Sequence, residues 1–288
     1  MLNETVKIIE CPRDAMQGIK QFIPTNDKIA YLNKLLKVGY HAIDFGSFVS
    51  HGVIPQMADT AKVVDGLQLD DSVSKLIAIV ANERGASDAC KFEPINCLGF
   101  PFSVSETFQK RNANSTIVEA VERVKRIREI CDKRNKELIL YISMAFGNPY
   151  GDAYNPEIVQ HWITELAQLD IRTFMLSDTI GVADPTIIRF LFSSLLPAFP
   201  LLEIGAHIHT APHNWKAKID AAYQNGCRRF DAAIKGYGGC PMAKDELIGN
   251  MPTEILLNYF TEEQLGNNFS ISAFEDALRI ANSVFPAH

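Results

Sequence analysis

The sequence predicts an α/β fold, a closed (β/α)8 barrel with extra C-terminal helices, and two observations carry this prediction. Eight β-rich segments alternate with longer amphipathic segments along the 288 residues, which is typical of parallel β/α units. The first β-rich segment is followed by ECPRDAMQG, and not by the glycine-rich turn of a doubly wound open sheet. A barrel of this kind needs about 250 residues. We therefore expect a single catalytic domain over 1–288, with 262–288 as a helical extension.

The predicted strands are short runs rich in β-branched and aromatic residues, at 6–11, 41–48, 75–82, 95–102, 137–144, 171–178, 202–209 and 229–236. The segments between them have apolar residues at helical spacing, as at Ile29, Leu32 and Leu36. The segment 115–136 repeats this pattern over about six turns. Asp184 and Pro185 have the residue types of a helix cap and a first helical position.

Composition and charge exclude several classes of partner. Hydrophobic residues make up 47% and charged residues 22% of the chain, which is ordinary for a globular enzyme. The net charge of −6 leaves no basic surface for nucleic acid and no polybasic patch for a membrane. No apolar run is long enough for a transmembrane helix, and no secretory signal is seen. The six cysteines form no CxxC pair, so we expect reduced thiols and a cytoplasmic location.

Polar residues gather where the predicted strands end. In a barrel of this type, function lies at the C-terminal ends of the strands, so these residues are expected to share one site. They lie at or just after the ends of six of the eight predicted strands, namely Arg13, Asp14, Asp44, Ser47, Ser143, Ser177, Asp178, Thr179, His207, His209 and Cys240. The other ends of the strands show no comparable set, which favours an enzyme over a binding scaffold.

A metal site is the first chemistry that these residues permit. His207 and His209 are two positions apart in a predicted strand, so their side chains point to the same face. Two imidazoles and the carboxylate of Asp14 suit a divalent cation such as Mn²⁺, or Mg²⁺ with added oxygen ligands. Asn250 offers a neutral carbonyl oxygen. The alternatives are structural histidines, a salt bridge from Asp14 to Arg13, and a helix cap at Asn250.

The remaining residues suit enolate and proton chemistry. Arg13 keeps its charge and can stabilise an oxyanion, unless it only pairs with a neighbouring carboxylate. Cys240 follows three glycines in a loop that could bend over a ligand and move a proton, unless the thiol is inert. Asp178 lies before a helix with its own cap, Asp184, which leaves its carboxylate free to accept a proton or to orient a histidine. Together these groups suit cleavage or formation of a carbon–carbon bond by an aldol or Claisen route.

With these residues, the chain resembles the hydroxymethylglutaryl-CoA lyases of the metal-dependent lyase barrel superfamily. The motifs occur in order over nearly the whole chain, as VKIIECPRDAMQ, GSFVS…IPQMAD, FQKRNANSTI, NPYGDAYNP, SDTIGVADP, HIH and GGCP…GN. The resemblance implies a TIM barrel that uses Mg²⁺ or Mn²⁺ to split 3-hydroxy-3-methylglutaryl-CoA into acetyl-CoA and acetoacetate. It also implies an acyl-CoA partner, a cytoplasmic homodimer and a place in leucine degradation.

Carried over by position, the resemblance assigns the metal to Asp14, His207, His209 and Asn250 and makes Arg13 the arginine at the substrate carbonyl. The catalytic set that it predicts is Arg13, Asp44, Asp178, His207 and Cys240.

The chain departs from the family pattern at three positions near the site. Ala15 stands where a glycine is usual, Asp44 replaces a glutamate, and Thr210 replaces an aspartate. These changes leave two further hypotheses open. The protein could be a related lyase or aldolase for another acyl-CoA or keto acid, or a degenerate barrel that binds metal or CoA without turnover.

Overall fold

The computed structural model describes residues 5–238, 248–266 and 268–285. Eight parallel strands close into a barrel, because the last strand pairs with the first. Each strand lies on one of the eight segments predicted from the sequence. In barrel order they are β1 (Lys7–Glu10), β2 (Ala42–Ser47), β3 (Lys75–Ile79), β4 (Ile95–Ser103), β5 (Glu137–Ser143), β6 (Thr173–Ser177), β7 (Glu203–His207) and β9 (Arg229–Ala232).

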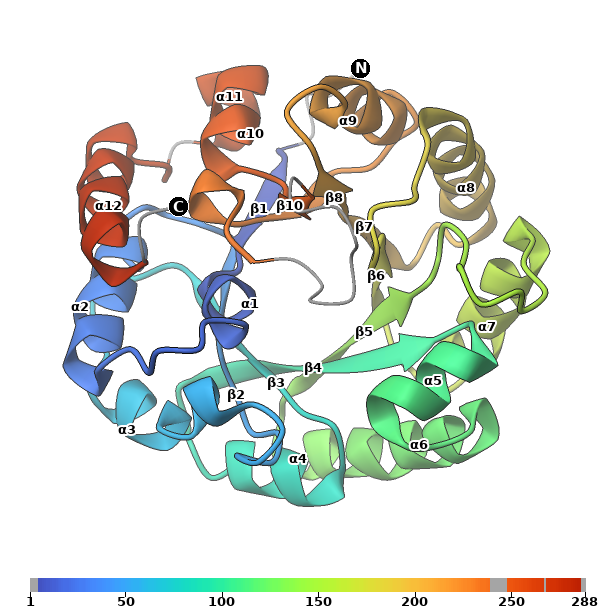
Figure 1. Ribbon diagram of the computed structural model, residues 1–288, viewed down its shortest axis with the longest axis horizontal. Helices are drawn as coiled ribbons and strands as arrows, with labels where there is room; N and C mark the ends of the chain where they lie inside the picture. The colour runs from blue at the N-terminus through green and yellow to red at the C-terminus, as the bar shows by residue number, and fades with distance from the viewer. Residues whose placement is uncertain (1–4, 239–247, 267, 286–288) are drawn as a thin grey trace.

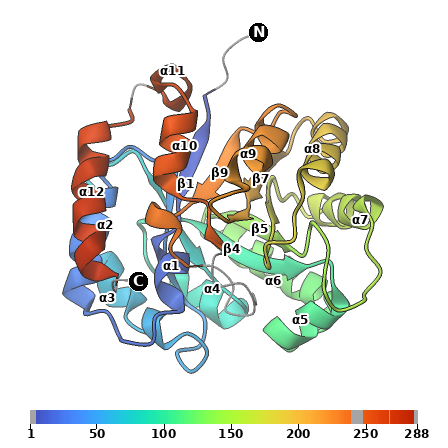
Figure 2. The same cartoon turned by 45° about the horizontal axis from the view of Figure 1, so that its top comes forward.

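Helices form an outer ring around this barrel (Figures 1 and 2). The helices between the strands and after β9 are α1 (Pro12–Gln17), α2 (Thr25–Leu35), α3 (Thr60–Asp65), α4 (Glu83–Ala89), α5 (Glu106–Ala113), α6 (Ile117–Lys133), α7 (Pro156–Ala167), α8 (Pro185–Ala198), α9 (Trp215–Tyr223) and α10 (Thr253–Tyr259). Two more helices, α11 (Glu262–Leu265) and α12 (Ile271–Val284), follow, and α12 lies beside α2. Within the described ranges, no helix is long and apolar enough to cross a membrane.

Side-chain caps explain where several helices begin. Asp184 accepts hydrogen bonds from the backbone N–H groups of Thr186 and Ile187, and Pro185 is the first residue of α8, as the sequence predicts. Thr116 and Glu119 form a reciprocal capping box at the start of α6. These local signals place the helices between the strands, and the strands therefore all run in one direction.

The apolar core has two shells that follow the alternation of each strand. Residues facing the barrel axis form a small cluster that includes Ile9, Cys11, Ile77, Tyr141 and Met175. Residues facing outward pack against the helices in a much larger cluster. Because the axis is filled by side chains, the polar groups that face the axis are confined to the two ends of the barrel.

Several predicted strands run past the observed C-terminal ends, as in 75–82, where β3 ends at Ile79. Arg13 and Asp14, which follow the first predicted strand, lie in α1, which begins at Pro12. The predicted strand 202–209 is interrupted at Ile208, so His207 ends β7 and His209 begins a separate strand, β8 (His209–Thr210). The predicted strand 229–236 ends at Ala232 and turns into the 3₁₀ helix η2 (Ile234–Gly236). A second 3₁₀ helix, η1 (Pro55–Met57), follows β2.

The break after β7 has a physical cause that lies far along the chain. β8 pairs antiparallel with β10 (Gly249–Asn250), and this two-stranded sheet is separate from the barrel. The pairing sets Asn250 directly opposite His209. A strand pattern read from residues 202–209 alone contains no signal for this partner.

Candidate active site

Asp14, His207 and His209 come together at the C-terminal mouth of the barrel. One ligand atom from each of the three side chains lies within 4.8 Å of the other two. Asp14 comes from the first turn of α1, His207 from the end of β7 and His209 from β8. The structure therefore juxtaposes three of the four residues that the sequence nominates as metal ligands.

His209 carries the observation that best tests whether a cation fits. Its side chain is buried, and neither ring nitrogen has a hydrogen-bond partner among the described residues. Burial, with the nearby charge of His207, lowers the pKa of His209 to about 3, so the ring is neutral. A neutral imidazole with a free lone pair is the form that binds a metal ion, and leaving both nitrogens unpaired in the interior is otherwise costly.

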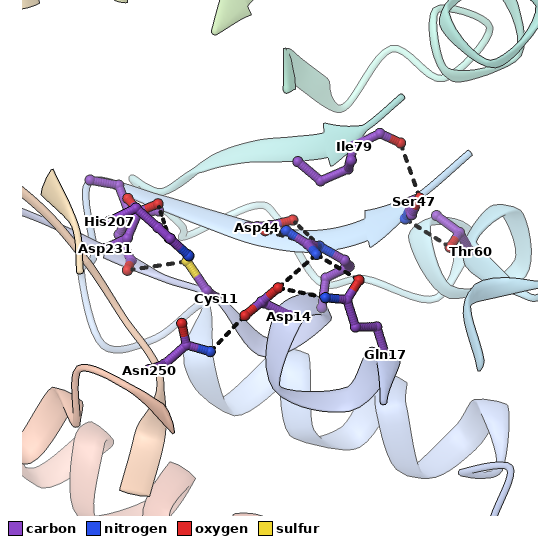
Figure 3. A network of polar contacts seen from close by, with 12 residues as sticks. Cys11, Asp14, Gln17, Asp44, Ser47, Thr60, Ile79, His207, Asp231 and Asn250 are labelled. Carbon is purple, nitrogen blue, oxygen red and sulfur yellow. Dashed lines mark hydrogen bonds and ion pairs between the residues drawn. The ribbon is translucent and has the colours of Figure 1, made fainter. Parts of the chain in front are cut away.

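Asp231 orients His207 from the neighbouring strand. Its Oδ2 lies 3.0 Å from Nδ1 of His207, so the other ring nitrogen is left for a ligand (Figure 3). Burial lowers the pKa of His207, but the hydrogen bond and the charge of Asp231 outweigh it and raise this pKa overall. A carboxylate behind a metal-binding histidine fixes the ring and raises its basicity. Sequence reasoning missed Asp231, although an acidic residue in an apolar strand was a signal for it.

Arg13 links two carboxylates at the same mouth. Its Nε lies 3.0 Å from Oδ2 of Asp44, and its Nη1 lies 2.9 Å from Oδ1 of Asp14 (Figure 3). Nη2 also donates to Asp44. Gln17, one turn along α1, accepts from Nη1 and donates to Oδ1 of Asp14 at 2.7 Å. The described residues accept from four of the five N–H groups of the guanidinium, and one N–H on Nη2 is left for a ligand.

The charges in this network support one another. Burial lowers the pKa of Arg13, but the charges of Asp44 and Asp14 raise it overall. Burial raises the pKa of Asp44 to about 6, and the hydrogen bonds from Arg13 oppose the rise. Burial also raises the pKa of Asp14, but Arg13 and the two histidines outweigh it and lower this pKa overall. Both carboxylates are therefore ionised near neutral pH.

Asn250 completes the cluster from β10. Its amide nitrogen donates to Oδ2 of Asp14 at 2.7 Å (Figure 3). It also donates to the carbonyl of Tyr237 at 2.8 Å. The amide oxygen is then the atom that faces away from Asp14 and can serve as a ligand. Gly238, at φ +87°, lies so close that a Cβ there would come within 2.7 Å of the Asp14 carbonyl oxygen. Only glycine fits this approach, which explains part of the glycine run before Cys240.

The carboxylate of Asp178 is already paired, although the sequence suggested that it would be unpaired because Asp184 caps the next helix. Its buried carboxylate pairs with Nζ of Lys218 at 2.9 Å and accepts from the backbone N–H of Ala183 at 3.0 Å. Lys218 also donates to the carbonyl of His209 at 2.8 Å. Asp178 therefore reaches the histidine pair through Lys218, a residue that looks like an ordinary surface lysine of an amphipathic helix in the sequence.

Cys240 lies outside the described residues, so the structure does not place its thiol. Thr210 and Ala15, two of the three departures, are both buried next to the cluster, Thr210 in β8 and Ala15 in α1. Asp44, the third, is the partner of Arg13. Each departure thus borders the site.

Comparisons with known proteins show the family to which the chain belongs. The family model described as HMGL-like matches residues 5–280. The chain is 33% identical to the cytoplasmic 3-hydroxy-3-methylglutaryl-CoA lyase of Rattus norvegicus, over 89% of this chain and 74% of that protein. It is 31% identical to a 3-hydroxy-3-isohexenylglutaryl-CoA/hydroxy-methylglutaryl-CoA lyase of Pseudomonas aeruginosa, over 96% of this chain and 91% of that one.

The fold is similar to that of a solved structure over nearly the whole chain. An HMG-CoA lyase from Acinetobacter baumannii, in complex with coenzyme A and 3-methylmalate, superposes with a TM-score of 0.88 at 27% identity. The match covers 99% of this chain and 92% of that one. The barrel topology, the residues at its mouth and the family match over nearly the whole length lead to one conclusion: the chain belongs to the HMGL-like family.

Proposed function

We propose that this protein is a divalent-metal-dependent carbon–carbon lyase that cleaves 3-hydroxy-3-methylglutaryl-CoA into acetyl-CoA and acetoacetate by a retro-Claisen route. The observation that carries the proposal is the cluster of Asp14, His207 and His209 beside a buried arginine. The names of the relatives supply the substrate class. The coenzyme A bound in the Acinetobacter protein supports an acyl-CoA partner.

Asp14, His207, His209 and the amide oxygen of Asn250 would hold the cation. This set offers one carboxylate together with neutral nitrogen and oxygen donors, a combination that suits Mg²⁺ or Mn²⁺. When bound, the cation supplies positive charge that polarises the hydroxyl and carboxylate oxygens of the substrate. Asp231 keeps His207 in the orientation that this role needs.

Arg13 would stabilise the charge that develops as the carbon–carbon bond breaks. The hydroxyl proton passes to a carboxylate at the mouth, a carbonyl forms on the acetoacetate side, and the bonding electrons move onto the acetyl-CoA carbon as an enolate. The remaining N–H of the Arg13 guanidinium can meet the enolate oxygen. Asp44 and Gln17 hold the guanidinium in place, so it does not have to reorganise during the reaction.

Asp178 would act as a positioning residue through Lys218, which binds the backbone of His209. Cys240 would return a proton to the enolate carbon. The described glycine turns at Gly236 and Gly238 bring the chain to the mouth just before this cysteine. Cys240→Ser should therefore bind metal normally and lose most of its turnover, because a hydroxyl is a much weaker acid than a thiol.

The finer parts of the proposal rest on the relatives and the resemblance. The Rattus relative is named as cytoplasmic, which supports a cytoplasmic location. A homodimer and a role in leucine degradation complete the proposal, and sedimentation velocity measures the first directly.

Release of acetyl-CoA from a panel of acyl-CoA substrates tests the function. We expect turnover of 3-hydroxy-3-methylglutaryl-CoA that requires Mg²⁺ or Mn²⁺ and stops with a chelator. The Pseudomonas relative is named for a longer branched substrate as well, so the panel includes that isohexenyl compound. Faster turnover of the longer substrate would assign the chain to the alternative acyl-CoA. No turnover of any substrate, with metal bound, would leave a non-catalytic barrel.

A further inference from the structure

The opposite end of the barrel contains a cavity of about 870 Å³. Its lining includes the first residue of β1, β2, β3, β5, β6, β7 and β9, and the second and third residues of β4. It therefore lies at the N-terminal ends of the strands, across the filled barrel axis from the residues described above. We call it the floor cavity.

Lysine and arginine side chains outnumber carboxylates in the floor cavity, although the chain carries a net charge of −6. Seven lysine and arginine side chains line it against five carboxylates. The two carboxylates at the strand starts are already paired. Glu203 accepts from Lys7 and from Arg229, and Glu137 accepts from Lys75. Glu203 thus neutralises only one of the two cations that contact it.

Arg229 lines the floor cavity from the start of β9 and is 4% exposed. Gly205 leaves room for Met175 and Arg229, because a Cβ at that position would lie 2.6 Å from the Met175 sulfur and 3.0 Å from the Arg229 Cβ. Nη1 donates to Glu203 at 2.7 Å, but the buried Nε has no hydrogen-bond partner in the part of the chain that the structure describes. A buried donor on a permanently charged group is costly to leave unpaired.

The pKa of His41, just before β2, is lowered by burial and in part by the positive charges around the floor cavity. Burial lowers its pKa to about 4, and the charges of Arg229 and Lys7 contribute in the same direction, against Glu203. Lys75 adds to this effect. The imidazole is therefore neutral near pH 7, and a neutral ring can donate one hydrogen bond to an acceptor in the cavity.

We propose that the floor cavity binds a small dianionic oxyanion, with Lys7, Lys75 and Arg229 as its cationic partners. A phosphoryl group and a short dicarboxylate share this chemistry, because both present several acceptor oxygens and two negative charges. The site is separate from the metal cluster and does not depend on the proposed lyase activity. The competing interpretation is that the same charges form structural ion pairs around water.

The test follows the His41 ring by NMR. The protein carries isotope-labelled histidine and is loaded with Mg²⁺ in the absence of Mn²⁺. Inorganic phosphate and succinate are titrated separately at about pH 8, with sodium chloride keeping the ionic strength constant. His41→Gln assigns the signal. We expect a saturable shift of the His41 signal with at least one of the two anions. The anion that binds with the higher affinity shows whether the site prefers a phosphoryl group or a dicarboxylate.

Paired variants show whether the cationic side chains bind the anion. Lys7→Gln with Lys75→Gln should weaken the saturable binding at least tenfold, because two charged donors are lost. Lys34→Gln is the matched control, since Lys34 is 38% exposed and pairs with one carboxylate, as Lys75 does at 39%. Thermal unfolding confirms that each variant is folded. A His41 signal that both anions leave unchanged, or equal binding in the double variant and the control, would overturn the proposal.

Discussion

The two ends of the barrel each contain a buried arginine, but the charges around these arginines have opposite balance. At the C-terminal mouth, Arg13 faces Asp14 and Asp44, and Asp231 adds a third carboxylate behind His207. At the floor, Arg229 shares Glu203 with Lys7. Excess carboxylate suits a cation, whereas excess ammonium and guanidinium suits an anion. One fold with a negative net charge therefore places opposite excesses of charge at the two ends of the barrel, separated by an apolar axis.

The largest expected effect is at the C-terminal mouth. Arg13→Gln should reduce turnover by about 10²–10³-fold, as loss of a fixed donor to an oxyanion typically does. Arg13→Lys should also be slow, because an ammonium keeps the charge but not the planar fork that bridges Asp44 and Asp14. Steady-state kinetics at saturating metal measures both variants.

The folded state of each Arg13 variant must be checked, since the substitution leaves two buried carboxylates without their partner. Circular dichroism and thermal unfolding serve as the control. Turnover within threefold of the unmodified protein in folded, metal-loaded Arg13→Gln would remove Arg13 from the mechanism.

The next effect concerns the floor and should appear in stability and not in catalysis. Glu203→Gln removes the carboxylate that pairs with the buried Arg229, and we expect a loss of roughly 2 kcal/mol in the free energy of unfolding. Turnover should stay unchanged, because the filled barrel axis lies between this group and the metal cluster. Urea unfolding and kinetics together measure the two quantities.

Glu137→Gln is the matched control for that prediction. Glu137 is 58% exposed and pairs with an exposed lysine, so its loss should change the free energy of unfolding by less than about 0.5 kcal/mol. A large fall in turnover for Glu203→Gln would show that the two ends of the barrel are coupled, and would contradict the separation of the two ends by the apolar axis.

His209→Ala should weaken Mn²⁺ binding at least tenfold, because one of four protein ligands is lost. The ring makes no hydrogen bond with the described residues, so the variant loses packing but no polar contact. Calorimetry measures the affinity, and His213→Ala, which removes an exposed histidine four residues away, is the control. Unchanged affinity in His209→Ala would show that the cation binds elsewhere.

The last expected effect is a change of stability with pH. Glu10 is fully buried beside β9, where it accepts from the Ile234 N–H at 2.8 Å and from the Thr253 hydroxyl at 2.5 Å. Burial raises its pKa from 4.5 to about 8, against these hydrogen bonds. The folded state therefore holds this proton more tightly than the unfolded state. Its contribution to stability is complete below pH 4.5 and is lost as the pH rises through about 8.

Between these two pH values the loss should be about 1.4 kcal/mol per pH unit. Glu10→Gln, which cannot titrate, should remove this slope. Urea unfolding of both proteins at several pH values measures the difference. Parallel pH profiles for the two proteins would show that Glu10 is already ionised in the folded state.

The sequence was most informative where structure is local. The alternation of β-rich and amphipathic segments predicted all eight barrel strands, and the Asp184–Pro185 pair predicted the start of α8. The histidine spacing and Asp14 predicted the three side chains that now lie within 4.8 Å of one another. Each of these predictions rests on a periodicity, a cap or a strand end, and such signals need no knowledge of distant partners.

The parts that could not be predicted depend on contacts between distant segments. The pairing of β8 with β10 joins residues about forty positions apart and breaks a strand that looks continuous in the sequence. Lys218 occupies a helix position where a lysine usually faces solvent, yet it is 2% exposed and binds Asp178. The floor cavity is lined by single charged residues at the starts of five strands, β1, β3, β5, β7 and β9, and no motif connects them.

The hydrogen bond between Asn250 and Asp14 spans 236 residues, and this has a consequence for how the protein is made. During synthesis, the first strand and α1 leave the ribosome long before β10 exists. The cluster of ligands therefore cannot be complete until nearly the whole chain has been translated. Binding of the proposed cation would then be a late event in biogenesis, and a nascent chain stalled before residue 250 would leave Asp14 without this partner.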